Sequence, residues 1–284
     1  MENTKIPVIY IVGSGHCGST LLDLIMGAHS KIMGVGEFEN YPVRSSEKEK
    51  TICTCKKTLA DCPFWNEVFK DIPENQDFTA YRSKIKFLLG LKNFVDKRKF
   101  QKIDIEKYLK LHEKVYGNIL ACSGKKIVLD SSKDSNRAEL LLLSKKLDII
   151  LIHLVRNGKA VMWSYKRKYG GVFSPLIRWL GNNLKIEVLK KRNKNAKIIF
   201  VRYKDLVRNP EKELTRILGK TGLSFEPGML DFWSVEHHQV EGNRLRLRGD
   251  KEIKEDLAWK EKLPKSNIFI FNLLAGWLNK IYKL

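Results

Sequence analysis

The segment that most constrains the fold is an apolar run followed directly by a glycine-rich loop. Residues 6–12, IPVIYIV, are rich in β-branched side chains and predict a buried strand. The loop GSGHCGST spans residues 13–20, and the apolar periodicity from Thr20 to about Ala28 predicts a helix. Backbone N–H groups in such a loop and the positive end of the following helix dipole bind phosphate. This order predicts an α/β fold with an anion site at the end of its first strand.

The loop lacks the lysine of a nucleoside triphosphatase. In the sequence G-x-x-x-x-G-K-[ST] the lysine binds the β- and γ-phosphates and the hydroxyl binds magnesium. Here Gly13 and Gly18 are followed by Ser19 and Thr20. The loop therefore suits a phosphate-bearing ligand that needs the glycine cradle without that cation. A kinase or NTPase with a degenerate loop is an alternative interpretation.

The rest of the chain alternates apolar runs with helical patterns. Strands are predicted at residues 126–130, 148–155 and 197–203, and helices at 134–146, 210–218 and within 75–121. Strands that alternate with helices favour a central parallel sheet flanked by helices on both faces. We expect one domain over residues 1–284, with a helical, cysteine-containing insert at about 45–122.

The charge of the chain points to anionic partners. The 53 Lys+Arg against 32 Asp+Glu give a net charge of +21, although the lysines are spread along the chain as on an ordinary solvated surface. A non-catalytic protein that binds nucleic acid or glycan is a further alternative, but no nucleic acid partner is expected. The chain opens without a signal-peptide pattern and has no apolar span of 18 residues, so a cytoplasmic location is expected.

The C-terminal residues 267–284 are apolar on most of one face and carry lysines at the end. This pattern favours a helix packed on the body of the protein over a membrane-surface helix. Peripheral membrane contact through this helix stays open.

The cysteines are expected to be reduced thiols. They are odd in number and no secretory signal precedes them. Three of them, Cys53, Cys55 and Cys62, cluster in CTCKKTLADC. Zinc sites usually have C-x₂-C spacing and a fourth ligand. The nearby sequence offers neither, so no metal is expected.

A second anion site is predicted after the strand at 148–155. The segment LVRNGKAVMWSYKR places Arg156 at the end of this strand and Ser164 eight residues later, about two helical turns on. A guanidinium group and a hydroxyl could together bind a second phosphate.

These two motifs in this order resemble the sulfotransferases that use 3′-phosphoadenosine 5′-phosphosulfate. HCGST at 16–20 is similar to the family's basic residue followed by [ST]-G-[ST]-[ST], and VRYKDL at 201–206 resembles its tyrosine-containing segment near the adenine. EGNRLRLRGDKEIKEDLAWKEKL at 241–263 resembles the loop that closes over the nucleotide, and CTCKKTLADCPFW is similar to a cysteine-rich insert of bacterial members.

The resemblance implies the P-loop-like sulfotransferase fold and a donor site in which the loop binds the 5′-phosphosulfate and Arg156 with Ser164 binds the 3′-phosphate. The residues implied to bind the donor are Gly15, His16, Cys17, Gly18, Ser19, Thr20, Arg156, Ser164, Tyr203, Asn243, Arg246 and Arg248.

The resemblance also implies direct in-line transfer to a hydroxyl or amine without magnesium, releasing 3′,5′-adenosine bisphosphate. Charge develops on the bridging oxygen, so a cation should lie nearby. His16 is one candidate if protonated, and Lys133 in DSSKDSNR is the other, because its segment resembles the lysine-containing segment of the protein-tyrosine sulfotransferases. Glu37 lies 21 residues after His16, a spacing similar to that of the catalytic glutamate in the same enzymes, and is the predicted base.

Other groups could serve as the base, and the acceptor is open. Glu39 and four histidines are weaker candidates for the base: His29, His153, His237 and His238. Residues 65–121 and the helix around FSPLIRWLGNN are expected to shape the acceptor cleft. The acceptor could be a small molecule, a glycan, a lipid or a peptide.

Overall fold

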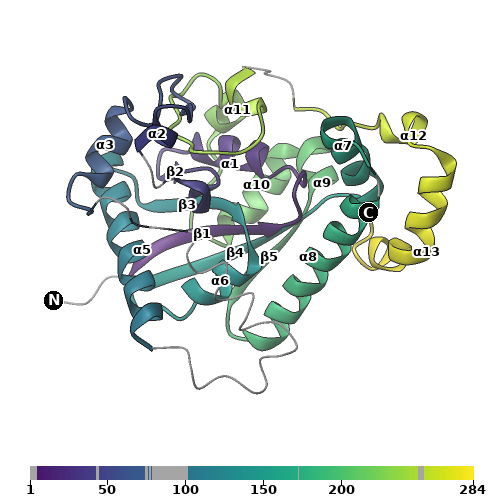
Figure 1. Ribbon diagram of the computed structural model, residues 1–284, viewed down its shortest axis with the longest axis horizontal. Coiled ribbons are helices and arrows are strands. Elements are labelled where there is room, and N and C mark those ends of the chain that lie inside the picture. The colour runs from purple at the N-terminus through teal and green to yellow at the C-terminus, as the bar shows by residue number, and fades with distance from the viewer. Residues whose placement is uncertain are drawn as a thin grey trace.

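A five-stranded parallel sheet forms the centre of the molecule (Figure 1). The computed structural model describes residues 5–42, 45–73, 76, 78, 102–171, 173–248 and 253–284, without the side chains of residues 45, 102–104 and 248. The strand order is β2-β3-β1-β4-β5. The strands are β1 Ile6–Gly13, β2 Ile32–Gly34, β3 Ile127–Lys133, β4 Leu147–Val155 and β5 Lys197–Arg202.

The predicted parallel sheet is confirmed, and one strand was not predicted. β1, β3, β4 and β5 lie where apolar runs predicted strands. The additional strand β2 has three residues, which is too short for a periodic pattern to be recognised. It pairs with β3 in parallel and forms one edge of the sheet.

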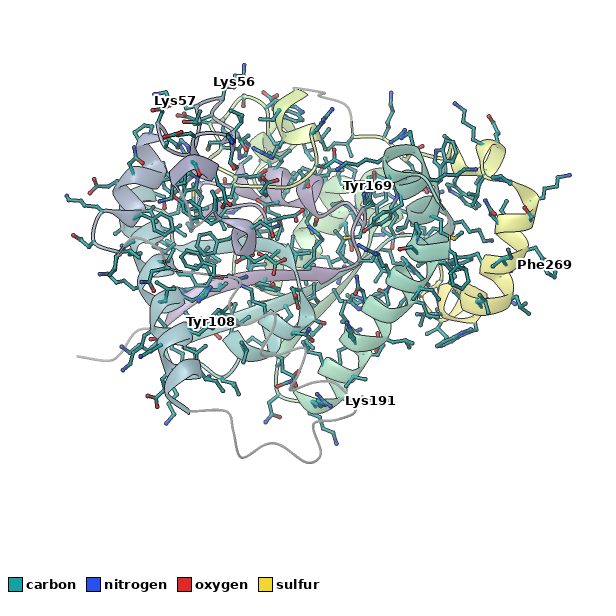
Figure 2. The ribbon with its side chains drawn as sticks, in the orientation of Figure 1. Lys56, Lys57, Tyr108, Tyr169, Lys191 and Phe269 are labelled. Carbon is teal, nitrogen blue, oxygen red and sulfur yellow. The ribbon has the colours of Figure 1, made fainter. Side chains whose placement is uncertain are left out.

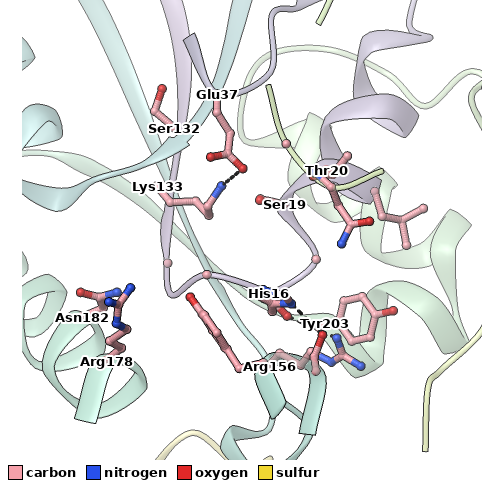
Figure 3. A pocket seen from close by; sticks show the side chains of 18 of the residues that line it. His16, Ser19, Thr20, Glu37, Ser132, Lys133, Arg156, Arg178, Asn182 and Tyr203 are labelled. Atoms are coloured by element: carbon pink, nitrogen blue, oxygen red, sulfur yellow. Dashed lines mark hydrogen bonds and ion pairs between the residues drawn. The ribbon is translucent and has the colours of Figure 1, made fainter. Parts of the chain in front are cut away.

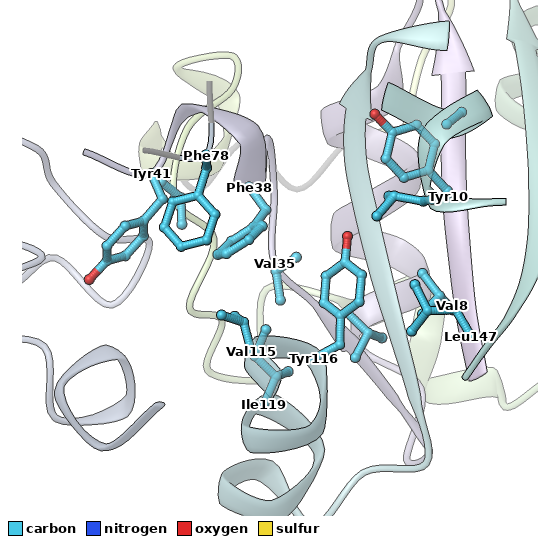
Figure 4. Close-up of a cluster of buried hydrophobic side chains, with 14 of the residues drawn as sticks. Val8, Tyr10, Val35, Phe38, Tyr41, Phe78, Val115, Tyr116, Ile119 and Leu147 are labelled. Atoms are coloured by element: carbon cyan, nitrogen blue, oxygen red, sulfur yellow. The ribbon is translucent and has the colours of Figure 1, made fainter. Parts of the chain in front are cut away.

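Alternation of side chains along β1 divides the core into two layers. Val8 and Tyr10 pack on one face, whereas Ile9 and Ile11 pack on the other. Figure 4 shows the first layer, where Val8 and Tyr10 lie near Tyr116. This face is covered by α3 Pro63–Phe69, α5 Lys102–Ser123, α6 Ser135–Leu141 and part of α8 Phe173–Arg192. The other face is covered by α1 Ser19–Gly27, α9 Tyr203–Arg208, α10 Pro210–Gly219 and the 3₁₀ helix η3 Pro227–Asp231.

Helix prediction was partly right. The predicted helices near Thr20 and Pro210 are present as α1 and α10, while the one after β3 ends at Leu141, earlier than expected. Of the helices expected within 75–121, α5 is present, and most of residues 75–101 lie outside the described part of the chain. The remaining short elements are η1 Phe38–Asn40, α2 Ser45–Lys48, α11 Leu245–Arg248 and α12 Trp259–Lys262.

The C-terminal helix α13, Lys265–Ile281, packs on the body of the protein against α7, Gly158–Tyr169, and α8. Phe271 is buried there, and a Cβ at Gly158 would lie 2.3 Å from its ring, so glycine permits the close approach. The outer face of α13 is nevertheless apolar: Phe269, which projects outward in Figure 2, is 69% exposed and Leu273 is 71% exposed. Within the described residues, no helix is long and apolar enough to cross a membrane.

A buried polar network fixes the end of β3. Asp130 and Arg137 are fully buried and their side chains lie 2.7 Å apart. Tyr116 donates a hydrogen bond of 2.7 Å to the same carboxylate, and the amide and hydroxyl of Ser132 donate to its other oxygen at 2.9 and 2.5 Å. The Asp130 carboxylate and its partners therefore fix the backbone just before Lys133.

Candidate active site

The carboxyl ends of β1, β3 and β4 meet beside a cavity of about 1240 Å³ (Figure 3). β1 lies between β3 and β4, where the chain switches from one side of the sheet to the other, which is the usual ligand position in an open α/β fold. The cavity is lined by the glycine loop, η1, the end of β3, α7, α8 and residues 241–243, 245, 254 and 256. The site predicted after the first strand thus lies in a cavity large enough for a nucleotide and a second molecule.

The glycine loop runs between two tyrosine rings. Gly18 has φ 101°, and a Cβ there would lie 2.3 Å from the ring of Tyr203. A Cβ at Gly15 would lie 2.1 Å from the hydroxyl of Tyr165. Only glycine allows the backbone to pass this closely, so the loop presents main-chain groups to the cavity.

His16 is a side chain of the loop that lines the cavity. Its Nδ1 lies 2.7 Å from the hydroxyl of Ser164, and its ring centroid lies 4.1 Å from that of Tyr165. Burial, and then the positive charges of Lys168 and Arg156, lower the pKa of His16 to about 4. The imidazole is therefore neutral at pH 7 in this environment, which does not favour the predicted role as a protonated cation.

Lys133 and Glu37 form an ion pair on the opposite side of the loop. Nζ of Lys133 lies 2.5 Å from Oε1 of Glu37, and the side chains are 13% and 22% exposed. Burial lowers the pKa of Lys133, but nearby acidic groups, Glu37 first among them, together outweigh burial and raise the pKa above its ordinary value. Asn40 donates a hydrogen bond of 3.2 Å to the second oxygen of Glu37. A firmly charged ammonium and a carboxylate therefore lie side by side, as the predicted cation and base require.

Backbone strain is concentrated at this site. Among the described residues, four that are not glycine have positive φ, and two of them are His16 at 62° and Lys133 at 71°. Such conformations persist only where the surroundings impose them, and they occur often at functional sites.

Arg156 follows β4 and lies beside the loop. Its Nη1 donates to the carbonyl oxygen of His16 at 3.3 Å, and its guanidinium lies 4.7 Å from the ring centroid of Tyr203. Nη2 lies 3.8 Å from Asp256, a lining residue within the segment 241–263 that is expected to close over the nucleotide. Asn157 accepts a hydrogen bond from the amide of Lys159, which starts α7. This start of the helix brings Ser164, in its second turn, to the same cavity.

The segment 241–243 packs against the loop. The amide of Asn243 donates to Oγ1 of Thr20 at 3.1 Å, and the amide of Glu37 donates to the carbonyl oxygen of Glu241 at 3.5 Å. Asn243 and Gly242 line the cavity, as expected for a segment that closes over the ligand.

Two of the predicted donor residues that the structure describes do not line the cavity. Cys17 is fully buried beneath the loop. Arg246 is also buried and donates to the carbonyl oxygen of Gln239 at 3.4 Å, so its guanidinium has a structural partner outside the cavity lining. The side chain of Arg248 lies outside the described residues.

Other candidates for the base have structural partners. His29 and His153 are buried, and they lie 3.0 Å from the carbonyl oxygen of Ser224 and 3.1 Å from the amide oxygen of Asn183. His237 is buried against the carbonyl oxygen of Phe232 at 2.7 Å.

Sequence reasoning missed several lining residues. Tyr165 could have been identified from its position, because it directly follows the predicted site residue Ser164 on α7. Arg178, Asn182 and Lys185 of α8 line the cavity, and their helical spacing is the signal that could have identified them. They agree with the expectation that FSPLIRWLGNN shapes the cleft, whereas none of the described residues in 65–121 lines it.

The fold is that of an α/β protein with a cavity, lined by a glycine loop, at the carboxyl ends of its strands. A model of the sulfotransferase family matches residues 7–227, and the chain belongs to this family. No curated protein matches the sequence.

Two solved structures show the same fold. The sulfotransferase domain of the Synechococcus PCC 7002 olefin synthase has a TM-score of 0.54 at 20% identity, and covers 96% of this chain and 95% of that one. The sulfotransferase domain from the curacin biosynthetic pathway has a TM-score of 0.53 at 17% identity, with 96% and 99% covered. The chain is therefore a sulfotransferase-family protein with a sulfotransferase fold.

Proposed function

We propose that this protein transfers the sulfuryl group of 3′-phosphoadenosine 5′-phosphosulfate to a hydroxyl or amine of an acceptor. The observation that carries the proposal is the arrangement around one cavity: a glycine loop, a Lys133–Glu37 pair on one side of it, and Arg156 with Ser164 on the other. A donor with phosphate groups at two positions of its ribose needs two such separate anion sites.

The chain's own residues divide the work of donor binding. Backbone N–H groups from Gly15 to Thr20 hold the 5′ end, helped by the dipole of α1. Arg156 and Ser164 hold the 3′-phosphate, and Tyr203, whose ring centroid lies 4.7 Å from the guanidinium of Arg156, is the residue that would lie beside the adenine. The neutral imidazole of His16 positions Ser164 through their 2.7 Å contact.

The transfer step needs a base and a cation, and the ion pair supplies both. Glu37 accepts the acceptor's proton as the acceptor oxygen or nitrogen bonds to sulfur. The bond from sulfur to the bridging oxygen breaks, and its electrons stay on the departing 3′,5′-adenosine bisphosphate. Lys133 neutralises the charge that develops on that oxygen.

The acceptor side of the cavity favours a polar molecule. Arg178 and Asn182 on α8 lie across from Lys133 (Figure 3), and Lys185 and Asn136 line the same cavity. Guanidinium, ammonium and amide groups suit an acceptor with several hydroxyls or an anionic group better than a flat apolar phenol. Screening saccharides, phenols, lipids and peptides with ³⁵S-labelled donor tests this, and a clear preference for unsubstituted phenols would contradict it.

Two substitutions test the proposal. Arg156→Ala should weaken binding of 3′,5′-adenosine bisphosphate by more than roughly 1.5–3 kcal/mol, since a charged hydrogen-bond donor to phosphate is lost. Arg192→Ala, which removes an exposed arginine that pairs with Glu139 on the surface, is the matched control. Isothermal titration calorimetry measures both, and equal affinities for the two variants would contradict the proposal.

Glu37→Gln should retain or tighten that affinity while abolishing sulfuryl transfer, because it removes the base and frees Lys133 for the phosphosulfate. Glu67→Gln, an exposed glutamate on α3, is its control. Persistent turnover in Glu37→Gln would assign the base to another group. Magnesium-dependent ATP hydrolysis by the wild type would instead favour the degenerate kinase or NTPase, and loop-independent polyanion binding would favour a non-catalytic binder.

We also propose a cytoplasmic protein that touches membranes through the exposed apolar face of α13. Phe269, Leu273 and Trp277 lie at helical spacing on that face, and Trp277 is 47% exposed. Co-sedimentation with anionic vesicles should fall in Leu273→Glu, and sedimentation that is unchanged would remove this proposal. The single domain over residues 1–284 with an insert at about 45–122 likewise stays a prediction, which limited proteolysis tests.

A further inference from the structure

A second cluster of reactive side chains lies outside the cavity, where the cysteine segment meets the segment before Asn243. Cys53, Cys55, Cys62 and His238 direct their ligand atoms toward a common point, and all of these atoms lie within 4.8 Å of one another. We propose that these four residues bind one zinc ion that ties residues 238–243 to the cysteine segment. This proposal does not depend on the sulfuryl-transfer reaction.

The distances fit a tetrahedral site. Sγ of Cys62 lies 3.7 Å from Sγ of Cys53, 3.6 Å from Sγ of Cys55 and 3.5 Å from Nδ1 of His238. Sγ of Cys53 lies 3.9 Å from the same nitrogen. Zinc–ligand bonds of about 2.3 Å to sulfur and about 2.0 Å to nitrogen space tetrahedral ligands by about 3.8 Å for two sulfurs and about 3.5 Å for sulfur and nitrogen.

The backbone of the cysteine segment is shaped to present sulfur. Ile52 and Thr58 form an antiparallel bridge, and Lys56 takes a positive φ of 70° at the turn between them. The amides of the turn and of the next helix hydrogen-bond to the sulfurs: Cys55 to Cys53, Lys57 to Cys55 and Trp65 to Cys62. Amide donors around each sulfur stabilise thiolates that ligate a metal.

The position of His238 is fixed by the residues that follow Cys62. The ring of Phe64 stacks on the imidazole with centroids 4.8 Å apart, and Nε1 of Trp65 donates to the carbonyl oxygen of His238 at 3.0 Å. Nε2 of the imidazole lies 3.9 Å from the carboxylate of Glu236, so Nδ1 faces the sulfurs. One short segment therefore supplies a sulfur ligand and holds the nitrogen ligand in place.

Zinc accounts for this set of side chains better than a disulfide does. A disulfide would use two of the three thiols and would not explain why the third thiol and His238 lie beside them. All five cysteines are free thiols. Three sulfurs and one imidazole nitrogen are a common structural zinc set. The expectation of no metal rested on the absence of C-x₂-C spacing and of a fourth ligand nearby, and His238 supplies the fourth ligand 176 residues after Cys62.

The site would have a structural role, because four protein ligands leave no open position for chemistry. The carbonyl oxygen of Gln239, next to His238, accepts hydrogen bonds from the amide of Thr54 at 3.3 Å and from Arg246 at 3.4 Å. Four residues further on, Asn243 bonds Thr20 of the glycine loop. The zinc would thus hold in place the segment that reaches the loop.

Metal analysis of the full-length protein tests the proposal. Untagged protein, purified with a phosphine reductant and no chelator, should contain about one zinc per chain by mass spectrometry of the metals. Cys62→Ser and His238→Gln should lose this zinc, and Cys122→Ser, which alters an exposed cysteine on α5, should keep it.

A measurement on the wild type keeps the test independent of how the variants fold. Mercurial titration of the thiols should release the zinc to an indicator dye, and Co²⁺ exchanged into the site should give the visible spectrum of a tetrahedral thiolate complex. The proposal is overturned by folded wild-type protein that contains no zinc and takes up none. Three other results would also overturn it: a disulfide among the cluster cysteines that persists in the presence of the reductant, the absorbance of an iron–sulfur cluster, or loss of zinc in Cys122→Ser.

Discussion

Replacing Arg137 with methionine should destabilise the protein by about 3–5 kcal/mol, because it leaves a charged carboxylate buried without its partner. Asp130 and Arg137 are both 0% exposed and lie 2.7 Å apart. Tyr116 and Ser132 still donate hydrogen bonds to Asp130, which places the loss nearer the lower end of that range. Urea denaturation at pH 7, followed by circular dichroism, measures the change in the free energy of unfolding.

The double variant separates a buried charge from lost packing. Asp130→Asn removes the negative charge that Arg137→Met leaves without a partner. The double variant should therefore lose about 0.5–3 kcal/mol less free energy of unfolding than the sum of the two single losses. Arg192→Met, at an exposed arginine, should change stability by less than about 0.5 kcal/mol. A loss below about 1 kcal/mol in Arg137→Met, or strict additivity in the double variant, would refute the reasoning.

Two other predictions concern the buried Asp23 on α1 and Gly18 in the glycine loop. Burial raises the pKa of Asp23 to about 7 from 3.8, so the folded state binds more protons than the unfolded state between these pH values. The free energy of unfolding should therefore fall by roughly 4 kcal/mol as the pH rises from 4 to 7. Asp23→Asn should flatten this pH dependence in thermal melts, and an unchanged slope would contradict the prediction. Gly18→Ala should weaken binding of 3′,5′-adenosine bisphosphate at least about tenfold, since strain of about 1–2 kcal/mol adds to the clash with Tyr203; calorimetry should show no such loss in Gly181→Ala, where a Cβ meets open space.

The sequence revealed those parts of the fold that depend on local pattern. β1 and β4 are continuous apolar runs because both faces of the sheet are covered, and such runs are visible without any tertiary information. β2 was missed because three residues carry no period, and it exists as a strand only through its pairing with β3. Helix α6 ends early at Leu141, where leucine periodicity alone predicts continuation.

The candidate site was recognisable where a residue sits at a fixed offset from a strand end. Lys133 ends β3 and Arg156 follows β4, so the topology of a parallel sheet brings them to the loop after β1. The protonation of His16 could not be read in the same way, because the pKa depends on burial and on nearby cations that arrive from α7. His238 could not be paired with the cysteines, because spacing gives no signal across 176 residues.

The segment 238–243 links the cysteine cluster to helix α1 and to the glycine loop. It is held at His238 by the cysteine cluster, at Gln239 by a 2.7 Å hydrogen bond to Asp23, and at Asn243 by Thr20. Asp23 lies on α1, directly behind the glycine loop, and its other oxygen accepts from the amide of Gly36. The segment 238–243 therefore contacts the glycine loop, the backbone next to Glu37 and the cysteine segment. Disrupting the cysteine cluster should increase the mobility of the loop and of the predicted base together.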